Sequence, residues 1–457
     1  MHEIKNIVEK QQQFFHKNHT KSLQFRKDQL ETLKKAIKEY EQPIYQALKE
    51  DLNKSEIESF ITEIYLCLEE INYAKKHLKH WMRKKYVYTP ISQFPSISYK
   101  VKEPYGVVAI ISPWNYPFLL SIQTLIGAIA AGNCAIIKMS EYAPRIATIL
   151  KEMIEKYFER EYIAVLDGGV EVADELLNQP LDYIFFTGST QVGKIVMEKA
   201  SKNLTPVTLE LGGKSPCIID ETVDISLTAK RIIFGKLING GQTCVAPDYI
   251  FVKKELKDKL VEELIHWIKA MYGTEPLENE NYPKIISKKH FERLMTLMEG
   301  EECVFGGYGN KDTLQITPTL LVHVSKQSPI MKEEIFGPIL PILTYQTMEE
   351  VVDYIKQGEK PLALYLFSKN KKVQKTIMNH LSFGGGCIND TLIHLTNNRL
   401  PFGGVGASGM GQYHGKYSFS TFSHEKGILV KGNLDLPLRY QPFTKMKQWV
   451  IKIMLRK

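Results

Sequence analysis

Several features that would assign a chain to a special class are missing from this sequence. No stretch approaches the roughly 20 apolar residues that a bilayer-crossing helix needs. The opening residues, MHEIKNIVEK, lack the apolar core of a signal peptide. The formal charge of +8, from 59 basic and 51 acidic residues, is too small for 457 residues to indicate nucleic-acid binding. With 44% hydrophobic and 24% charged residues, the composition is that of an ordinary globular protein.

The six cysteines show no short repeated spacing. This excludes a disulfide framework and a zinc site, so we expect no metal, and it predicts a reducing, cytoplasmic environment. Five of them stand in apolar or helical segments, where a cysteine is most often a buried structural residue. These five are Cys67, Cys134, Cys217, Cys303 and Cys387. Cys244 has different surroundings, which are described below.

The length of the chain predicts two or three domains, because one simple core rarely holds so many residues. Residues 1–88 are rich in Lys, Glu and Gln, with apolar residues at helical spacing, and predict two or three amphipathic helices. Their apolar stripe includes Ile61, Ile64, Tyr65 and Leu68. Residues 86–100 contain β-branched and aromatic residues with two prolines, which favours extended segments or an edge hairpin.

Five strand-length apolar segments alternate with helix-length segments over residues 105–211. They are GVVAII, CAIIK, IAVL, YIFF and PVTLEL. This alternation predicts an α/β fold with a doubly wound, Rossmann-like parallel sheet. A similar alternation resumes over residues 212–405 and predicts a second α/β domain. No internal repeat of solenoid period is present.

The loop GSTQVGK, residues 188–194, is one residue short of a phosphate-binding P-loop. Ile195 stands where a Ser or Thr would hold magnesium, which argues against an ATP- or GTP-hydrolysing switch. A strand, a glycine turn and a helix N-terminus still suit a metal-free dinucleotide. A purely structural turn is the alternative. We expect Ile195 to face the packing surface of the following helix and Lys194 to be solvated.

Three polar residues stand in positions that favour chemistry. Cys244 follows two glycines, which allow close approach to a ligand, and a helix N-terminus beside it would favour the thiolate. Asn115, in PWNYP, follows the first buried strand. Glu210 lies within an apolar strand and is a candidate general base. The alternatives are a buried structural cysteine, a surface amide and a salt bridge, respectively.

Together the motifs resemble those of the aldehyde dehydrogenase family. PWNYP, KMSE, FTGSTQVG, LELGGKSP, GQTC, EEIFGP and PFGGVGASGMG occur in the family's order over residues 105–411. The early PWNYP, GQTCVAPDY and the HGKYSF segment are similar to the class 3 branch. The resemblance implies a small bridging and oligomerisation sheet built from residues 89–104 and 406–432, linking an NAD(P)-binding domain to a catalytic domain. One departure is Met139, where the family usually has proline.

The resemblance also implies a role for each matching site residue. Cys244 is expected to be the nucleophile, and Asn115 is expected to hold the oxyanion with the Cys244 backbone N–H. Glu210 is expected to activate the water that hydrolyses the thioester, with Glu334 as the alternative base. The implied cofactor-binding residues are Trp114, Lys138, Glu141, Gly188, Ser189, Gly193, Glu334 and Phe336. The Glu141 carboxylate should disfavour a 2′-phosphate, so we expect NAD, with NADP as the alternative.

A class 3 enzyme is expected to be a homodimer that oxidises aromatic, polyene or medium- to long-chain aliphatic aldehydes. The alternatives are a coenzyme A-acylating aldehyde dehydrogenase and a non-catalytic nucleotide-binding protein. The basic tail, residues 433–457, ends in a segment whose apolar residues share one helical face, with no acidic residue from position 444 onward. Residues 444–457 therefore predict either weak contact with an anionic membrane surface or a helix packed on the protein or left frayed.

Overall fold

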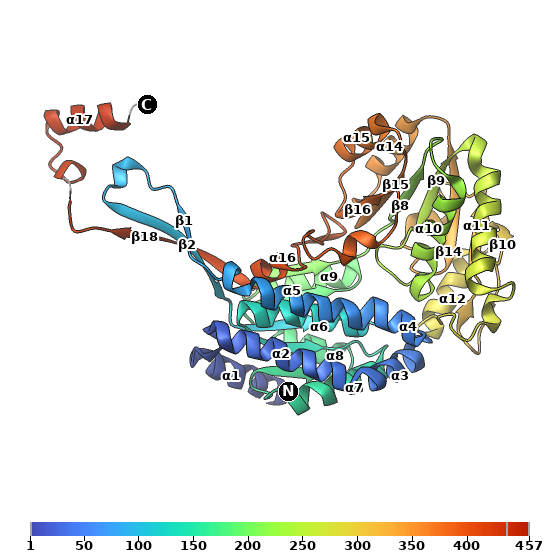
Figure 1. Cartoon of the computed structure of the whole chain (residues 1–457), viewed down its shortest axis with the longest axis horizontal. Coiled ribbons are helices and arrows are strands. Elements are labelled where there is room, and N and C mark those ends of the chain that lie inside the picture. The colour runs from blue at the N-terminus through green and yellow to red at the C-terminus, as the bar shows by residue number, and fades with distance from the viewer. Residues whose placement is uncertain (1, 436, 456–457) are drawn as a thin grey trace.

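The computed structural model describes residues 2–435 and 437–455. Two parallel-sheet bodies lie side by side, and a narrow arm of β-strands projects from them (Figure 1). The C-terminal helix lies at the far end of this arm. No helix among the described residues is long and apolar enough to cross a membrane.

The first parallel sheet has six strands in the order β17-β7-β6-β3-β4-β5. Their bounds are β3 Val107–Ile111, β4 Cys134–Lys138, β5 Ile163–Leu166, β6 Tyr183–Thr187, β7 Val207–Glu210 and β17 Gly409–Met410. The connecting helices are α6 Pro117–Ala131, α7 Pro144–Tyr157, α8 Val170–Leu177 and α9 Thr190–Ser201. β3 to β7 pair in parallel, as the alternation predicts. β3 and β4 are buried along their whole length, because helices cover both faces of such a sheet.

The sequence did not reveal the edge strand β17. It pairs antiparallel with β7, placing Gly409 opposite Glu210. Residues 406–432 therefore do not serve the bridging sheet alone, because their first part extends the first parallel sheet. A strand of two residues is too short to show a pattern of apolar and polar residues in the sequence.

The second parallel sheet has the order β10-β13-β14-β9-β8-β15-β16, with only β10 antiparallel to its neighbour. Its bounds are β8 Pro216–Ile219, β9 Tyr249–Lys253, β10 Glu302–Phe305, β13 Thr319–Val322, β14 Ile339–Tyr345, β15 Ala363–Phe367 and β16 Gly385–Ile388. Its helices are α10 Ile225–Leu237, α11 Lys257–Tyr272, α12 Lys288–Leu297, α13 Pro329–Lys332, α14 Met348–Gln357 and α15 Lys371–His380. The short pair β11 Gly309–Asn310 and β12 Gln315–Ile316 lies apart.

The N-terminal region holds more helices than the two or three expected. They are α1 His2–His16, α2 Leu23–Glu39, α3 Glu41–Leu52, α4 Glu56–Ser59 and α5 Tyr65–Trp81, with a π-helical turn η2 Phe60–Ile64 before α5. The predicted apolar stripe was partly wrong: Ile64 is buried, whereas Ile61 and Tyr65 are exposed. A π-turn spaces residues differently from an α-helix, which changes the buried face. The helices pack on α6 and α7.

The arm is a three-stranded antiparallel sheet in the order β1-β2-β18. Its bounds are β1 Lys85–Val87, β2 Ser96–Pro104 and β18 Ser423–Lys431. β1 therefore begins one residue before the extended stretch predicted from residue 86, and four residues before the bridging segment expected at residue 89. β2 and β18 pair from Ser96↔Lys431 to Pro104↔Ser423. The short helix α16 Lys416–Thr421 precedes β18, and α17 Lys445–Leu455 follows it.

Candidate active site

Cys244 lies in a turn between the two parallel-sheet bodies. The preceding residues Asn239, Gly240 and Gly241 all have left-handed φ angles of 53°, 61° and 75°. A Cβ on Gly241 would stand 2.3 Å from the Gly337 carbonyl oxygen, so only glycine fits there. This backbone path explains why two glycines precede Cys244.

The Cys244 thiol is not placed at a helix N-terminus, which corrects the expectation of a dipole-stabilised thiolate. Residues 244–248 form a turn and a loop that lead into β9. Burial raises the pKa of the thiol, and the nearby carboxylates of Glu334 and Glu210 raise it further. The backbone N–H groups of Cys244 and Val245 oppose this shift. The residue is partly exposed, so a small molecule can reach it.

Asn115 is 3% exposed and reaches the same turn. It follows β3, at the carboxyl edge of the first sheet, and Pro117 then begins α6. Its side-chain Nδ2 donates to the Gln242 carbonyl oxygen at 3.0 Å, two residues before Cys244. The alternative of a surface amide is therefore excluded.

Glu210 ends β7 with its side chain 2% exposed. Neither carboxylate oxygen has a hydrogen-bond partner among the described residues, so the salt-bridge alternative fails there. Burial raises the pKa of this carboxyl well above its ordinary value. An unpaired buried carboxyl is costly, and such groups concentrate at functional sites.

Glu334 is the second carboxyl of the site. Burial, with the charge of Asp248, raises its pKa from 4.5 to about 8, although Lys214 and Arg293 oppose the shift. A Cβ on Gly212 would stand 1.9 Å from Glu334 Oε2, so a glycine is needed for the carboxylate to lie against the backbone. The sequence motifs alone did not show that the pKa values of both Glu210 and Glu334 are raised.

Trp114 and Phe336 come from different bodies and meet edge to face, with ring centroids 5.3 Å apart. His290, on α12, packs against both Trp114 and Tyr142. Its ring centroid lies 5.2 Å from that of Trp114 and 6.0 Å from that of Tyr142. His290 and Tyr142 were not identified from the sequence, because each stands outside a recognisable motif. This aromatic group spans the two parallel-sheet bodies.

The glycine loop leads directly into α9. Ser189 caps the helix by accepting a hydrogen bond from the Val192 N–H, and Gly188 immediately precedes it. Gly193 lies inside the first turns of α9, where an added Cβ would stand 2.7 Å from Leu211. Gly193 therefore allows the helix to approach β7 closely. The expectation for Ile195 was wrong: its side chain is 51% exposed, because Val196 occupies the packing face.

Lys138 ends β4 and is almost fully buried. Its Nζ donates to the carbonyl oxygens of Met139 at 2.6 Å and Gly168 at 2.7 Å, and it lies 3.4 Å from Glu141 Oε2. Burial lowers the pKa of Lys138. The Glu141 side chain is 40% exposed, so its carboxylate remains accessible to a sugar hydroxyl.

The residues fit a dinucleotide. A cavity of about 570 Å³ borders the first turns of α9, the Gly212–Gly213 pair and Glu334. It therefore lies where the two parallel-sheet bodies meet, at the carboxyl edge of the first sheet, which is where such folds bind nucleotides. No group of three or more potential metal ligands occurs among the described residues.

The other cysteines confirm the structural expectation only in part. Cys67, Cys134 and Cys217 are buried, Cys387 is partly exposed and Cys303 is exposed. Cys303 was expected to be buried, but it lies on β10, the edge strand of its sheet, whose residues are mostly exposed. All six are free thiols.

Two Rossmann-like bodies that share a cysteine, an amide and two carboxyls with raised pKa values define a nucleotide-dependent α/β enzyme. The chain belongs to the aldehyde dehydrogenase family, whose model, described as Aldehyde dehydrogenase family, matches residues 1–428. It is an aldehyde dehydrogenase that depends on NAD or NADP.

Curated relatives match almost the whole chain. A 4,4'-diaponeurosporen-aldehyde dehydrogenase of Staphylococcus aureus is 52% identical over 432 residues, covering 93% of this chain and 94% of that protein. A dimeric NADP-preferring aldehyde dehydrogenase of Canis lupus familiaris is 45% identical, covering 97% and 98%. The solved substrate-bound state of Staphylococcus aureus AldH superposes with a TM-score of 0.97 at 50% identity, covering 99% of this chain and 100% of that one. The class 3 resemblance is confirmed.

Proposed function

We propose that the enzyme oxidises an aldehyde to the carboxylic acid through a covalent adduct on Cys244. The observation that carries this assignment is the unpaired, buried Glu210 carboxyl in the same site as a cysteine and a buried amide. Asn115 supplies the amide. A carboxyl without a partner is free to exchange a proton with a bound water.

In the first step the Cys244 sulfur adds to the aldehyde carbon and gives up its proton. A tetrahedral hemithioacetal with an oxyanion forms. The Asn115 Nδ2 group and the Cys244 backbone N–H donate to this oxygen, an interaction whose loss typically costs about 2.7–4 kcal/mol of barrier. Because the pKa of the thiol is raised, its proton needs an acceptor, and the candidates are Glu334 and Glu210, the carboxyls whose charges act on the thiol.

When bound, NAD or NADP would supply a hydride acceptor, and loss of a hydride (one proton with two electrons) from the former aldehyde carbon would leave a thioester on Cys244. We assign Glu210 to take a proton from the water that attacks this thioester. The carboxylic acid then leaves and the thiol is restored. Glu334 is the alternative base, because its pKa is also raised into the neutral range.

We assign the cofactor to the cleft between the two parallel-sheet bodies. Lys138 and Glu141 bind the adenosine ribose, and the Glu141 carboxylate favours NAD over NADP. The residues along the dinucleotide are Trp114, Gly188, Ser189, Gly193, Glu334 and Phe336. The capped N-terminus of α9 supports the placement of its pyrophosphate.

We assign a long apolar aldehyde, of the polyene or long-chain aliphatic type, as the substrate. The Staphylococcus aureus relative is a diaponeurosporen-aldehyde dehydrogenase, and the identity of 52% supports a related substrate.

The assignment is tested with Cys244→Ser and Glu210→Gln, assayed with NAD and a long-chain aldehyde. We expect Cys244→Ser to abolish reduced-cofactor formation while cofactor binding persists. Glu210→Gln should give one rapid turnover and then a loss of steady-state rate of about 10²–10⁴-fold, because the thioester accumulates. Mass spectrometry of the trapped enzyme should show an acyl group on Cys244.

Three outcomes would contradict parts of this assignment. Full activity of Cys244→Ser would remove the nucleophile. Formation of acyl-coenzyme A in place of free acid would make the enzyme an acylating aldehyde dehydrogenase. If Glu334→Gln rather than Glu210→Gln stalls after one turnover, Glu334 is the base.

We further propose that the enzyme is a cytoplasmic homodimer joined through its arm. The dimeric relative supports this state, and the arm exposes the large apolar residues Ile97, Leu429 and Val430, with Ile97 paired to Val430 in the sheet. Exposed apolar strands are a common association surface. The free state of all six cysteines supports a reducing compartment.

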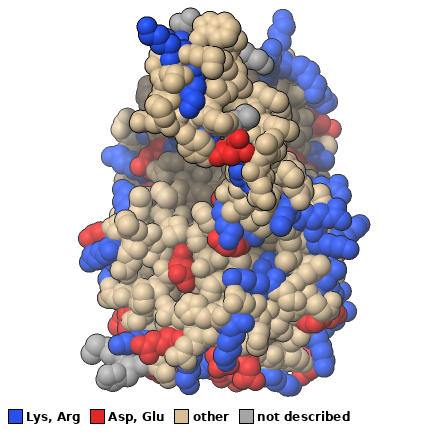
Figure 2. All heavy atoms as spheres, turned by 90° about the vertical axis from the view of Figure 1, so that its left-hand side faces the viewer, with Lys and Arg blue, Asp and Glu red and all other residues tan. Residues whose placement is uncertain are grey.

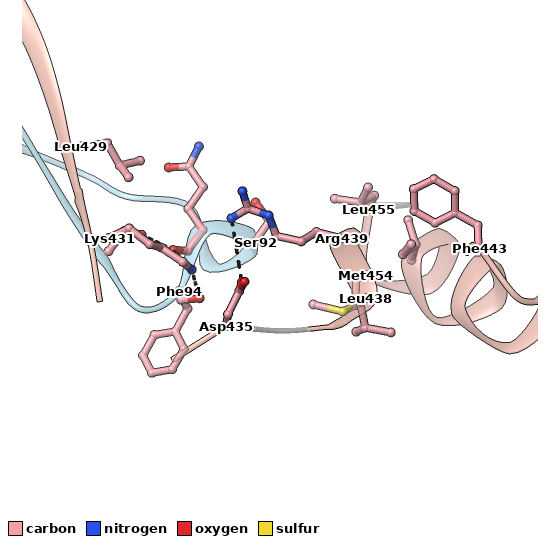
Figure 3. Close-up of a pocket in the computed structure, with 13 residues that line it drawn as sticks. Ser92, Phe94, Leu429, Lys431, Asp435, Leu438, Arg439, Phe443, Met454 and Leu455 are labelled. Carbon is pink, nitrogen blue, oxygen red and sulfur yellow. Dashed lines mark hydrogen bonds and ion pairs between the residues drawn. The ribbon is translucent and has the colours of Figure 1, made fainter. Parts of the chain in front are cut away.

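We also propose that α17 makes weak contact with an anionic membrane surface. Figure 3 shows the tail against the arm, where a groove of about 500 Å³ is lined by Phe94, Leu429 and Phe443, among others. The tail is therefore joined to the arm rather than packed on the main body. Met446 and Trp449 remain 74% and 65% exposed. Figure 2 shows basic side chains beside broad uncharged surface at this end of the molecule.

A further inference from the structure

The N-terminal helices place a buried ion pair behind the active site. Lys54 Nζ lies 2.5 Å from Glu63 Oε1, and both side chains are fully buried. Lys54 follows α3, and Glu63 lies in the π-helical turn η2, so neither belongs to a parallel-sheet body. A buried ion pair is often no more stabilising than apolar residues of the same volume, so its role is better sought in what it contacts.

Lys54 contacts the loop that carries Asn115. Its Nζ donates to the Asn115 carbonyl oxygen at 3.4 Å and lies 4.0 Å from the centroid of the Tyr116 ring. Asn239 adds a second hydrogen bond to the same carbonyl oxygen, from its Nδ2 at 2.8 Å. The backbone of Asn115 is therefore held from behind by an ammonium and an amide.

Glu63 holds the next part of the same loop. Its Oε2 accepts hydrogen bonds from the backbone N–H groups of Phe118 at 2.9 Å and Leu119 at 3.1 Å. These are among the first N–H groups of α6, which lack partners within the helix. A carboxylate there is also favoured by the helix dipole. The ion pair thus fixes both the Asn115 backbone and the start of the helix that follows it.

The front of this loop contacts the turn that holds Cys244. Asn115 Nδ2 donates to the Gln242 carbonyl oxygen at 3.0 Å. The Tyr116 hydroxyl and Thr243 Oγ1 lie 2.7 Å apart. A displacement of the loop would therefore move the amide and the nucleophile relative to each other.

We propose that Lys54 and Glu63 are positioning residues that set the geometry of the Asn115 amide against Cys244 and so control the rate of adduct formation. This inference rests on the role assigned to Asn115 under Proposed function. The π-helical turn matters to it, because Glu63 lies within that turn and its side chain reaches the start of α6. Such turns often occur at functional sites.

The test compares Lys54→Met with a matched control, Arg26→Met. Arg26 is also a buried basic residue of the N-terminal helices, but its Nη1 donates to the Ala130 carbonyl oxygen, at the opposite end of α6. Single-turnover formation of reduced cofactor is measured at saturating NAD and aldehyde. We expect Lys54→Met to slow this step by about 10²-fold, as misplacement of a reacting group by about 1 Å does.

Three further measurements separate a specific effect on the position of Asn115 from a general destabilisation of the fold. The dissociation constant for NAD, from fluorescence titration, should be unchanged in Lys54→Met. Lys54→Arg, which keeps the charge, should recover part of the lost rate. Glu63→Gln keeps an oxygen to accept from Phe118 and Leu119 but loses the charge, so it should fold and still react slowly.

The inference is overturned if folded Lys54→Met and Glu63→Gln react at the wild-type rate, or if Arg26→Met slows the same step equally. Asn115→Ala separates the role of Asn115 from the role of the ion pair. If Asn115→Ala reacts normally, the role of Asn115 itself is wrong. If only Asn115→Ala is slow, the oxyanion assignment holds and the positioning role of the ion pair fails.

Discussion

Cys244 lies where its surroundings keep it as a thiol. Burial and two carboxyls raise its pKa, and the pKa values of both carboxyls are themselves raised by burial. Transfer of the Cys244 proton to the carboxylate of Glu210 or Glu334 leaves the net charge of the site unchanged. It therefore avoids the cost of adding another buried charge.

Glu334 should make stability depend on pH. Its pKa is raised from 4.5 to about 8, so the folded state binds this proton more tightly than the unfolded chain. The free energy of unfolding should therefore fall as pH rises from about 5 to 8, by at most about 1.36 kcal/mol per pH unit for one proton. Glu334→Gln should remove this contribution and reduce the fall. Urea unfolding at pH 5 and pH 8 measures both slopes.

The neighbouring Glu333 provides the control for this measurement. Its side chain is exposed and pairs with Arg293 at 3.1 Å. Glu333→Gln should keep the wild-type pH dependence. Equal slopes for wild type and Glu334→Gln would show that the Glu334 pKa is not raised in the folded protein.

At the scale of elements, β17 closes the edge of the first sheet against β7. Gly409 has a φ of 143°, and an added Cβ would stand 2.2 Å from the Leu209 carbonyl oxygen. Gly403, from the same segment, approaches Glu210 Oε1 so closely that a Cβ there would lie at 3.2 Å. Glycines thus let the backbone of this segment lie directly against Glu210.

Gly409→Ala should therefore destabilise the edge and disturb Glu210. We expect a loss of about 1–3 kcal/mol in the free energy of unfolding, because the backbone must leave its strained conformation or shift away from β7. Gly427→Ala is the matched control, since nothing lies within 4 Å of its added Cβ on β18. Denaturant unfolding and the rate of acid formation are measured for both. If the two variants behave alike, close pairing of β17 is not required.

For the first parallel-sheet body, the sequence predicted β3 to β7 and the helices between them to within a few residues, because buried parallel strands appear as continuous apolar runs. For the second body it predicted the α/β alternation but not the strands β10 and β13 or the helices α12 and α13. It could not predict β17, which has two residues, or the ion pair of Lys54 and Glu63, whose partners are fixed only by packing. Ile195 failed for a local reason, because the phase of α9 places Val196 inward. Residues within motifs, such as Asn115, could be picked out from the sequence. Lys54 and Glu63, which contact the loop that carries Asn115, could not.

At the scale of the whole molecule, the arm separates the proposed dimer and membrane contacts from the active site. β2 and β18 pair over nine residues, so the arm is a continuous ribbon that extends from the main body to the tail (Figure 1). The active site lies between the two parallel-sheet bodies, at the other end. Changes in the tail should therefore alter binding to an anionic membrane surface without altering the rate of aldehyde oxidation.

Deletion of residues 433–457 tests this separation. α17 presents Met446, Trp449 and Ile453 to solvent beside three lysines, and each Lys near an anionic surface contributes about 1 kcal/mol. The full chain should bind vesicles containing anionic lipid, more weakly as salt rises, whereas the deleted form should not sediment with them. Both forms should remain dimers and oxidise a water-soluble aldehyde at the same rate, because the arm strands and the site are intact. Neutral vesicles are the control, and equal binding by both forms would show that the tail is not the membrane contact.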